Sequence, residues 1–252
     1  MTTEGLVRGR PVSLAVLDYG LFRVHANGRV IGIVGFLIRT DRDETILVDT
    51  GFPEAYAHDA VTASALDGLD RFGEVLELTP RNLPAYQLGL LGLVPEDVDL
   101  LVMTHSHIDH VGGIAGFPQA PILVAAADRA EPRPLYFGTV RRIDWPDRTY
   151  ITVTGDTALG PGLQVLLVPG HVPGQLALRV DLPQTGPCLL LGDAVSRPAE
   201  IDEQFDTAHD PAAAQASAAR LMALAAECSA FVIYGHCPAQ WPQLEKAPAL
   251  YR

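Results

Sequence analysis

The sequence predicts a layered α/β domain, and three observations support this fold class. Strand signals and helix signals are mixed along the whole chain, which is typical of sheets covered by helices. Several strand segments are continuous apolar runs, which indicates strands buried on both faces. The 252 residues are 48% hydrophobic and 19% charged, so the chain can build a sizeable core and is not mainly disordered. We find no internal repeat and no low-complexity linker, and we expect one domain over residues 1–252.

The elements can be assigned in chain order. β-Branched and aliphatic residues predict strands over 12–20, 31–39, 45–51, 99–105, 121–126, 163–171, 176–182, 188–194 and 230–236. The clearest helix covers 211–228, with Asp210 as N-cap and Pro211 at the first helical position. A weaker helix is expected around 53–69. The proline-containing segment 128–148 is either a surface loop or a lid over a site.

Charge and cysteine content exclude several classes of protein. Lys and Arg number 18 against 30 Asp and Glu, a net charge of −12. Phosphate backbones and anionic headgroups repel such a chain, so we expect no nucleic-acid or membrane partner. The three cysteines are too few for a disulfide framework, and the sequence shows no secretory leader and no membrane-spanning run. We therefore expect a cytoplasmic protein, either a monomer or a homodimer.

Metal-competent side chains follow four separate apolar strands. The first strand end carries a dense His-x-His-x-Asp-His cluster, and each of the other three carries one such residue. The candidate ligands are His105, His107, Asp109, His110, His171, Asp193 and His236. Because strand ends at one edge of a sheet lie close together, these side chains can converge. The other histidines, His25, His58 and His209, have no such context and are expected to be surface or loop residues.

The number and type of these ligands favour two metal ions. Imidazole and carboxylate ligands suit zinc, and also manganese or iron, with cobalt a further possibility. Seven ligands exceed what one tetrahedral ion needs, and they suit a pair of ions about 3.5–4 Å apart.

Asp49 ends an otherwise apolar strand, and a buried carboxylate needs partners. Two interpretations are open at this point. Asp49 either orients a ligating histidine or the turn that carries the cluster, or it caps its own turn through the amides of Thr50 and Gly51.

Five segments, taken together and in order, resemble the metallo-β-lactamase superfamily. They are ILVDTG at 46–51, THSHIDHVGG at 104–113, PGHVPGQ at 169–175, LLGDA at 190–194 and YGH at 234–236. The resemblance implies an αββα sandwich, with two mixed sheets face to face, helices outside and the site at one edge. It also implies that His105, His107 and His171 hold one ion, that Asp109, His110 and His236 hold the other, and that Asp193 bridges both together with a water or hydroxide.

Within the superfamily the chain looks most like the N-acyl-homoserine lactonases and the related pyridoxolactonases. This implies attack of a metal-bridging hydroxide on the carbonyl of a lactone, with Asp109 passing a proton to the leaving alkoxide. The quorum-quenching lactonases typically carry a tyrosine three residues after the bridging aspartate, where this chain has Ser196, and often an aromatic residue where it has Ile108. We therefore expect Asp109, Asp193, Ser196 and Tyr136 to act in catalysis, with Tyr136 a substitute for the missing tyrosine.

An apolar pocket is expected beside the metals, lined by residues such as Ile108, Phe22, Leu69 and Phe137, and it would suit a small neutral lactone or ester. An aryl-ester, phosphotriester or thioester hydrolase on the same fold is the alternative. A thioester substrate such as a glutathione conjugate would need a basic site, and the only basic cluster near the motifs is Arg141–Arg142. A diiron redox protein is less favoured, since such proteins usually have an attached flavin domain and the chain ends about 16 residues after His236.

Overall fold

The first layer of the computed structural model is a seven-stranded mixed sheet. The structure describes residues 5–252, so residues 1–4 of the predicted domain lie outside it. The strand order is β4-β1-β2-β3-β5-β6-β7. The strands are β1 Pro11–Val24, β2 Val30–Thr40, β3 Thr45–Val48, β4 Gly73–Glu77, β5 Leu100–Val102, β6 Ile122–Ala125 and β7 Tyr150–Val153. Neighbours from β4 to β3 pair antiparallel, and those from β3 to β7 pair parallel.

The second layer is a five-stranded sheet in the order β12-β11-β10-β9-β8. Its strands are β8 Thr157–Gly160, β9 Leu163–Leu167, β10 Leu176–Leu182, β11 Gly186–Leu190 and β12 Phe231–Ile233. Only β11 and β12 pair parallel; the other neighbours are antiparallel.

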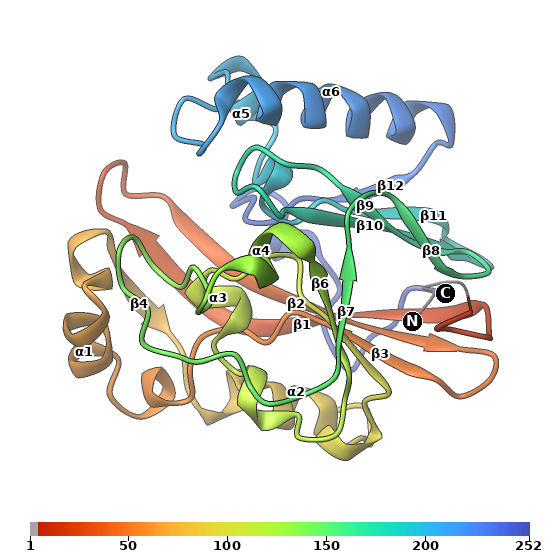
Figure 1. Cartoon of the computed structure of the whole chain (residues 1–252), viewed down its shortest axis with the longest axis horizontal. Helices are drawn as coiled ribbons and strands as arrows, with labels where there is room; N and C mark the ends of the chain where they lie inside the picture. Colours follow the sequence, from red (N-terminus) through yellow and green to blue (C-terminus); the bar gives the residue numbers. More distant parts are fainter. Residues whose placement is uncertain (1–4) are drawn as a thin grey trace.

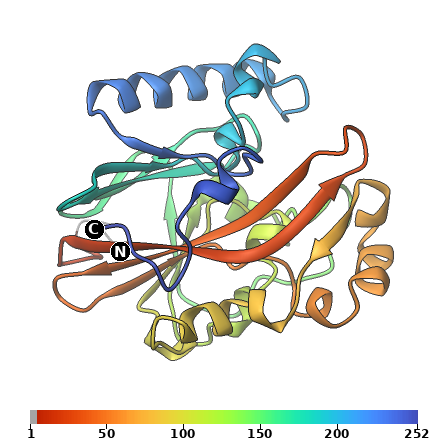
Figure 2. The ribbon, with the colours of Figure 1, turned by 180° about the vertical axis from the view of Figure 1, so that it is seen from behind.

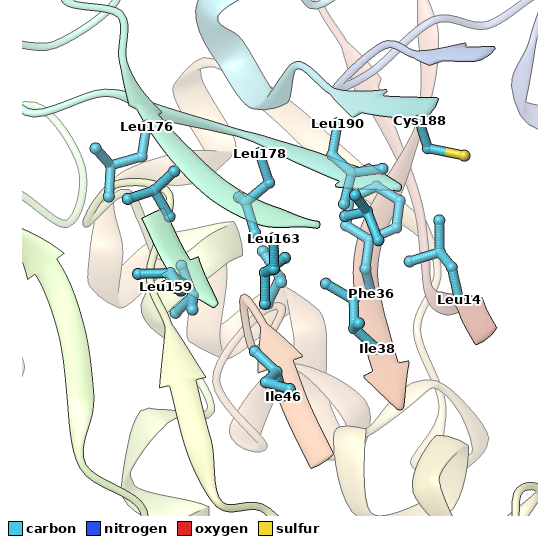
Figure 3. Packing of buried hydrophobic residues seen from close by; sticks show 14 of the residues in the cluster. Leu14, Phe36, Ile38, Ile46, Leu159, Leu163, Leu176, Leu178, Cys188 and Leu190 are labelled. Carbon is cyan, nitrogen blue, oxygen red and sulfur yellow. The ribbon is translucent and has the colours of Figure 1, made fainter. Parts of the chain in front are cut away.

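The two sheets pack face to face through a dry layer of aliphatic side chains. Leu176, Leu178 and Leu190 of the second sheet meet Phe36 and Ile46 of the first, and all are buried (Figure 3). Burial of apolar surface contributes roughly 25 cal/mol per Å², so this layer is a main source of stability.

Helices cover the outer faces, which gives the helix–sheet–sheet–helix order of the predicted sandwich (Figures 1 and 2). Helices α1 Ala55–Asp67 and α2 Pro84–Gly89 contribute buried side chains to the outer face of the first sheet. Helix α6 Pro211–Glu227 packs Ala214, Ala218 and Leu221 against the second sheet. Three shorter helices, α3 Ile108–Val111, α4 Ala126–Ala130 and α5 Ala199–Asp202, lie in the connections. No helix in the part of the chain that the structure describes is long and apolar enough to cross a membrane.

Most predicted elements are confirmed, with different ends. All nine predicted strands and both helices occur, and Asp210 caps α6 by accepting a hydrogen bond from the amide of Ala213 at 3.0 Å. Strands β1 and β2 are longer than predicted, and β10 has the predicted bounds. Segments 45–51, 99–105, 163–171, 188–194 and 230–236 run past the ends of the strands, because the prediction included the turn residues that follow. Strands β4, β7 and β8 were not predicted.

Shortening a side chain between the sheets is expected to destabilise the fold. Leu178→Ala removes a fully buried side chain and leaves a cavity, which should lower the free energy of unfolding by about 3 kcal/mol. Urea unfolding followed by circular dichroism measures the effect. Val61→Ala is the control, because Val61 is 82% exposed and should change stability by less than about 0.5 kcal/mol. Equal stability of the two variants would contradict the assignment of the inter-sheet layer.

Candidate metal centre

The first sheet supplies four of the seven predicted ligands from one short segment. The chain leaves β5 at Val102, runs extended through His105 and His107, and then enters α3, which carries Asp109 and His110. The carbonyl of His110 accepts hydrogen bonds from the amide and the hydroxyl of Thr50, at 2.7 and 2.8 Å. The segment is therefore anchored to the end of β3.

The second sheet supplies the other three ligands, each after a different strand. His171 follows β9, Asp193 lies in the short turn after β11, and His236 follows β12. The amide of Leu176 donates to the carbonyl of Thr104 at 2.8 Å, which ties the start of β10 to the segment of the first sheet that carries His105. Gly235 comes so close to the turn after β11 that a Cβ there would lie 2.4 Å from the carbonyl oxygen of Gly192, so no larger residue fits.

The seven side chains converge on one place and form two groups joined by Asp193. In the first group, the ligand atoms of His105, His107 and His171 lie within 4.8 Å of one another, and His171 Nε2 is 3.1 Å from His107 Nδ1. The same holds for Asp109, His110 and His236 in the second group.

Asp193 reaches both groups with different oxygens. Its Oδ2 is 3.4 Å from Nε2 of His171. Its Oδ1 is 3.2 Å from Nε2 of His236 and 3.5 Å from Nε2 of His110. A carboxylate placed this way can bridge two ions.

Three atoms at the centre carry the strongest sign of metal binding. Nε2 of His105, Nε2 of His110 and Oδ1 of Asp193 are buried and have no hydrogen-bond partner among residues 5–252. An unsatisfied buried polar atom is costly, and a bound cation would satisfy all three. The residues therefore fit a pair of divalent ions, although the donor set does not distinguish zinc from manganese, iron or cobalt.

Asp49 binds residues 104–110, the segment that carries four of the predicted ligands, through three hydrogen bonds. Its Oδ1 accepts from the amide of Thr104 at 2.8 Å, and its Oδ2 accepts from the Thr104 hydroxyl at 2.7 Å and from Nδ1 of His110 at 2.8 Å. The interpretation that Asp49 orients a ligating histidine is thus confirmed, and Nε2 of His110 is left to face the centre. Asp49 adopts φ of 60°, an uncommon conformation for a non-glycine residue.

Two other ligands are oriented in a similar way. Nδ1 of His236 lies 2.9 Å from the carbonyl oxygen of Gly32, which can only accept, so this nitrogen carries the proton. The Thr104 hydroxyl donates to Asp49, so it can accept from Nδ1 of His105 at 3.3 Å. In both histidines Nε2 is then the free ligand atom.

The charges at the centre separate the histidines into two classes. Burial and the neighbouring histidines lower the pKa of His105 well below its usual value, and burial with His171 lowers the pKa of His107 to about 3. Burial also lowers the pKa of His171. For His110 and His236 burial acts in the same direction, but Asp109 and Asp193 outweigh it and raise the pKa to about 10 and about 9. The nearby His236 and His110 outweigh the effect of burial on Asp193 and hold its pKa well below the usual range.

Tyr136 and the start of the 128–148 segment pack on the metal segment. The amide of Tyr136 donates to the carbonyl of Ser106 at 2.9 Å, and the amide of Ile108 donates to the carbonyl of Tyr136 at 2.8 Å. The Tyr136 hydroxyl donates to the buried carboxylate of Asp67 at 2.9 Å, beside the hydroxyl of Tyr56. The Tyr136 hydroxyl is thus hydrogen-bonded to Asp67 at the end of α1. Its role as a donor to the substrate stays a prediction. The role of segment 128–148 as a lid stays a prediction as well.

Ser196 is buried directly behind the turn of Asp193. Its amide donates to Oε2 of Glu200 at 2.7 Å, and its carbonyl accepts from the amide of His236 at 2.9 Å. These backbone contacts join the Asp193 turn to the His236 segment. The catalytic role of the Ser196 hydroxyl stays a prediction.

The cleft beside the candidate metal centre is less apolar than the sequence analysis expected. A cleft of about 390 Å³ opens at His171 and Asp193, and its wall mixes apolar side chains with five charged ones. The charged residues are Arg29, Arg197, Glu200, Glu203 and Asp206. Of the side chains predicted to line the pocket, Phe22 and Leu69 are instead in the core under the outer face of the first sheet. The two arginines were missed because they lie in loops outside the motifs, and only the fold brings them together.

The Asp49 contacts generate one prediction. An amide has one acceptor oxygen, so Asp49→Asn leaves at least one of three buried donors unpaired and releases His110. Loss of such an outer contact should weaken metal binding roughly 10- to 100-fold. Competition with a chromophoric chelator measures the affinity, and Glu96→Gln makes the same chemical change at an exposed position. Unchanged affinity in Asp49→Asn would show that His110 needs no such support.

The different pKa values of the histidines predict that metal binding releases protons. At pH 7.5 His110 and His236 are protonated in the metal-free protein, since the pKa values are about 10 and about 9, whereas His107 is neutral. Metal bound by His110 and His236 must displace both protons, so affinity at this group should rise with pH and reach a plateau only above about pH 10. Titration of metal-free protein with zinc chloride in weakly buffered indicator should release about two protons per chain. Release of less than one proton would contradict the assignment.

The seven-residue arrangement can be compared with known proteins. The family model described as the metallo-beta-lactamase superfamily matches residues 29–236, which include every residue of the two ligand groups. An N-acyl homoserine lactonase from Bacillus cereus is 30% identical over 205 residues, 80% of this chain and 79% of that protein. N-acyl homoserine lactonase AttM from Azorhizobium caulinodans is 33% identical over 185 residues, 66% of this chain and 68% of that protein.

Solved structures show the same fold. A mutant of B. thuringiensis AiiA, with N-decanoyl-L-homoserine bound at its active site, superposes with a TM-score of 0.83 at 25% identity, over 96% of this chain and 100% of that one. An N-acyl homoserine lactone hydrolase, with N-hexanoyl-L-homoserine bound at its catalytic metal center, superposes with a TM-score of 0.82 at 26% identity, also over 96% of this chain and 100% of that one. The family match, the relatives and the shared fold lead to one conclusion: the chain belongs to the metallo-β-lactamase superfamily.

Proposed function

We propose that this protein is a dinuclear metal-dependent hydrolase that opens a small lactone, of the acyl-homoserine lactone kind or similar. The observation that carries the proposal is the pair of ligand groups joined by Asp193, with three buried ligand atoms that have no other partner. The relatives named N-acyl homoserine lactonase, which this chain covers to about four fifths, support the lactone as substrate class.

In this proposal His105, His107 and His171 would hold one ion, Asp109, His110 and His236 would hold the other, and Asp193 would contribute to both sites; zinc is the favoured metal. Two such ions, when bound, lower the pKa of water toward about 7 and polarise a carbonyl. Hydrolysis breaks the bond between the carbonyl carbon and the ring oxygen and adds the oxygen of water to the carbon. One proton of the water goes to the ring oxygen, which becomes an alcohol, and the other is released to solvent, which leaves a carboxylate.

The protein's own groups position the reactants and move one proton. Asp109 lies at the mouth of the second group, with its Oδ2 3.4 Å from Nε2 of His236 and its side chain 17% exposed. We assign to it the transfer of a proton to the leaving alkoxide. Ser196 and Tyr136 are retained as candidates for contact with the substrate carbonyl; the Tyr136 hydroxyl would first have to leave Asp67.

Hydrolysis assays on metal-loaded protein test the proposal. Acyl-homoserine lactones of several chain lengths and simple γ- and δ-lactones should be opened, faster than an aryl ester, a phosphotriester or a thioester, with acid release followed by a pH indicator. Removal of metal by a chelator should abolish turnover, and His107→Ala should lower kcat/KM roughly a thousandfold, because several kcal/mol of stabilisation are lost.

The control is His25→Ala, which truncates an exposed histidine in the β1–β2 turn and should leave neutral-lactone turnover unchanged. Metal-dependent activity confined to the ester, phosphotriester or thioester would refute the lactonase proposal and name the substrate class instead. Full activity after chelation would refute the metal mechanism itself.

A further inference from the structure

Two arginines from different layers of the fold meet at the cleft beside the metal centre. Arg29 lies at the end of the turn between β1 and β2, and Arg197 lies four residues after Asp193. Both line the cleft that His171 and Asp193 also line. Figures 1 and 2 show the β1–β2 hairpin end and the segment around α5 at the same end of the molecule. The chain has only 18 Lys and Arg residues, so two in one small cleft need an explanation.

Arg29 lies near several carboxylates but forms an ion pair with none of them. Within residues 5–252 its side chain makes no ion pair and no hydrogen bond, and its Nε is buried without a partner. Burial and the like charge of Arg197 lower the pKa of Arg29, and together they outweigh the opposite effect of the carboxylates of Glu200, Glu203 and Asp193. A partly buried guanidinium without a bonded partner keeps N–H groups free to pair with an anion in the cleft.

Arg197 is held in place but not saturated. One terminal nitrogen donates to Oε2 of Glu203, its side chain is 17% exposed, and its Nε is also buried without a partner. A guanidinium has five N–H donors, so Arg197 can hold Glu203 and still donate to a ligand in the cleft.

The two nearest glutamates bond to other groups than Arg29. Glu203 pairs with Arg197, and Glu200 accepts from the amide of Ser196 at 2.7 Å. Burial, followed by the charge of Asp193, raises the pKa of Glu200. The three acids of the wall would still repel a doubly charged phosphate more than a singly charged group, and a planar carboxylate matches the parallel N–H groups of a guanidinium.

We propose that Arg29 and Arg197 form a carboxylate-binding subsite beside the metal centre, and that the natural substrate is a small lactone that carries a carboxylate. The proposal rests on the lactonase function given above and replaces the neutral substrate expected from the sequence. The lactone carbonyl reaches the metals while the carboxylate lies against Arg29, within a cleft of about 390 Å³ that suits a small molecule.

A pair of matched lactones tests the subsite on metal-loaded protein. γ-Butyrolactone is neutral, and 5-oxotetrahydrofuran-2-carboxylate is the same ring with one carboxylate. The wild type should prefer the charged lactone, and Arg29→Gln should lower kcat/KM for it roughly 10- to 100-fold while leaving the neutral lactone unchanged. For Arg29→Lys, kcat/KM for the charged lactone should lie between the values of the wild type and Arg29→Gln. Lysine keeps the positive charge but lacks the parallel N–H groups of the guanidinium. Arg42→Gln removes an exposed arginine outside the cleft and is the control.

The two ring-opened products can be compared as inhibitors. The comparison shows whether Arg29 binds the carboxylate that the substrate already carries or the one that forms on ring opening. Arg29→Gln should weaken inhibition by 2-hydroxyglutarate, which has both carboxylates, and leave inhibition by 4-hydroxybutyrate unchanged. Equal weakening of both would overturn the proposal, since Arg29 would then bind the carboxylate formed on ring opening. Equal turnover of both lactones in wild type and Arg29→Gln would overturn it as well.

If neither lactone is hydrolysed, the proposed function fails and the subsite is decided by binding alone. Calorimetry with 2-hydroxyglutarate on metal-loaded wild type and Arg29→Gln gives that result. Binding at least tenfold weaker in the variant supports the subsite, and equal binding or no binding in the wild type overturns it. Metal content, measured for every variant, shows that the centre itself is intact.

Discussion

The packing of the two sheets against each other is the contact on which the candidate metal centre depends. Four ligand side chains follow β5 in the first sheet, and the remaining three follow β9, β11 and β12 in the second. Neither sheet has a complete site, because the group of His105, His107 and His171 and the group of Asp109, His110 and His236 each draw on both sheets. The aliphatic layer between the sheets therefore stabilises the fold and the centre through the same contacts.

Within that frame, a small number of hydrogen bonds determine which atoms face the ions. Asp49 binds the Thr104 amide, the Thr104 hydroxyl and His110, and Gly32 binds His236, so the outer nitrogen of each ring is occupied. The carboxylates that would bind metal also raise the pKa of His110 and His236, whereas His105 and His107 stay neutral. A metal ion at the second ligand group would therefore have to displace protons, whereas an ion at the first group would bind without that exchange.

The ligand set could be predicted from the sequence because each ligand follows an apolar strand and four of them share six consecutive positions. The partners of Asp49 could not, since Thr104 and His110 lie 55 and 61 residues away and only the pairing of β3 with β5 brings them near. Strands β4 and β8 were missed because each has mostly polar or small residues and lies at an edge of its sheet. The charged wall of the cleft was missed for a related reason: Arg29 and Arg197 belong to loops, and their sequence neighbours carry no pattern of their own.

The β1–β2 turn has a consequence for how this scaffold can change. Gly32, which orients His236, lies inside β2 at a position where a Cβ would collide with Trp241, whereas Arg29 is three residues away in a turn whose neighbouring residues are exposed. Insertions and replacements are tolerated best in such exposed turns. Exchange of residues 25–29 can therefore alter the charge that a substrate meets without disturbing the residues that hold the metals. With the proposed arginine subsite, variation in this hairpin would change which substrate charge is preferred while the two ligand groups stay as they are.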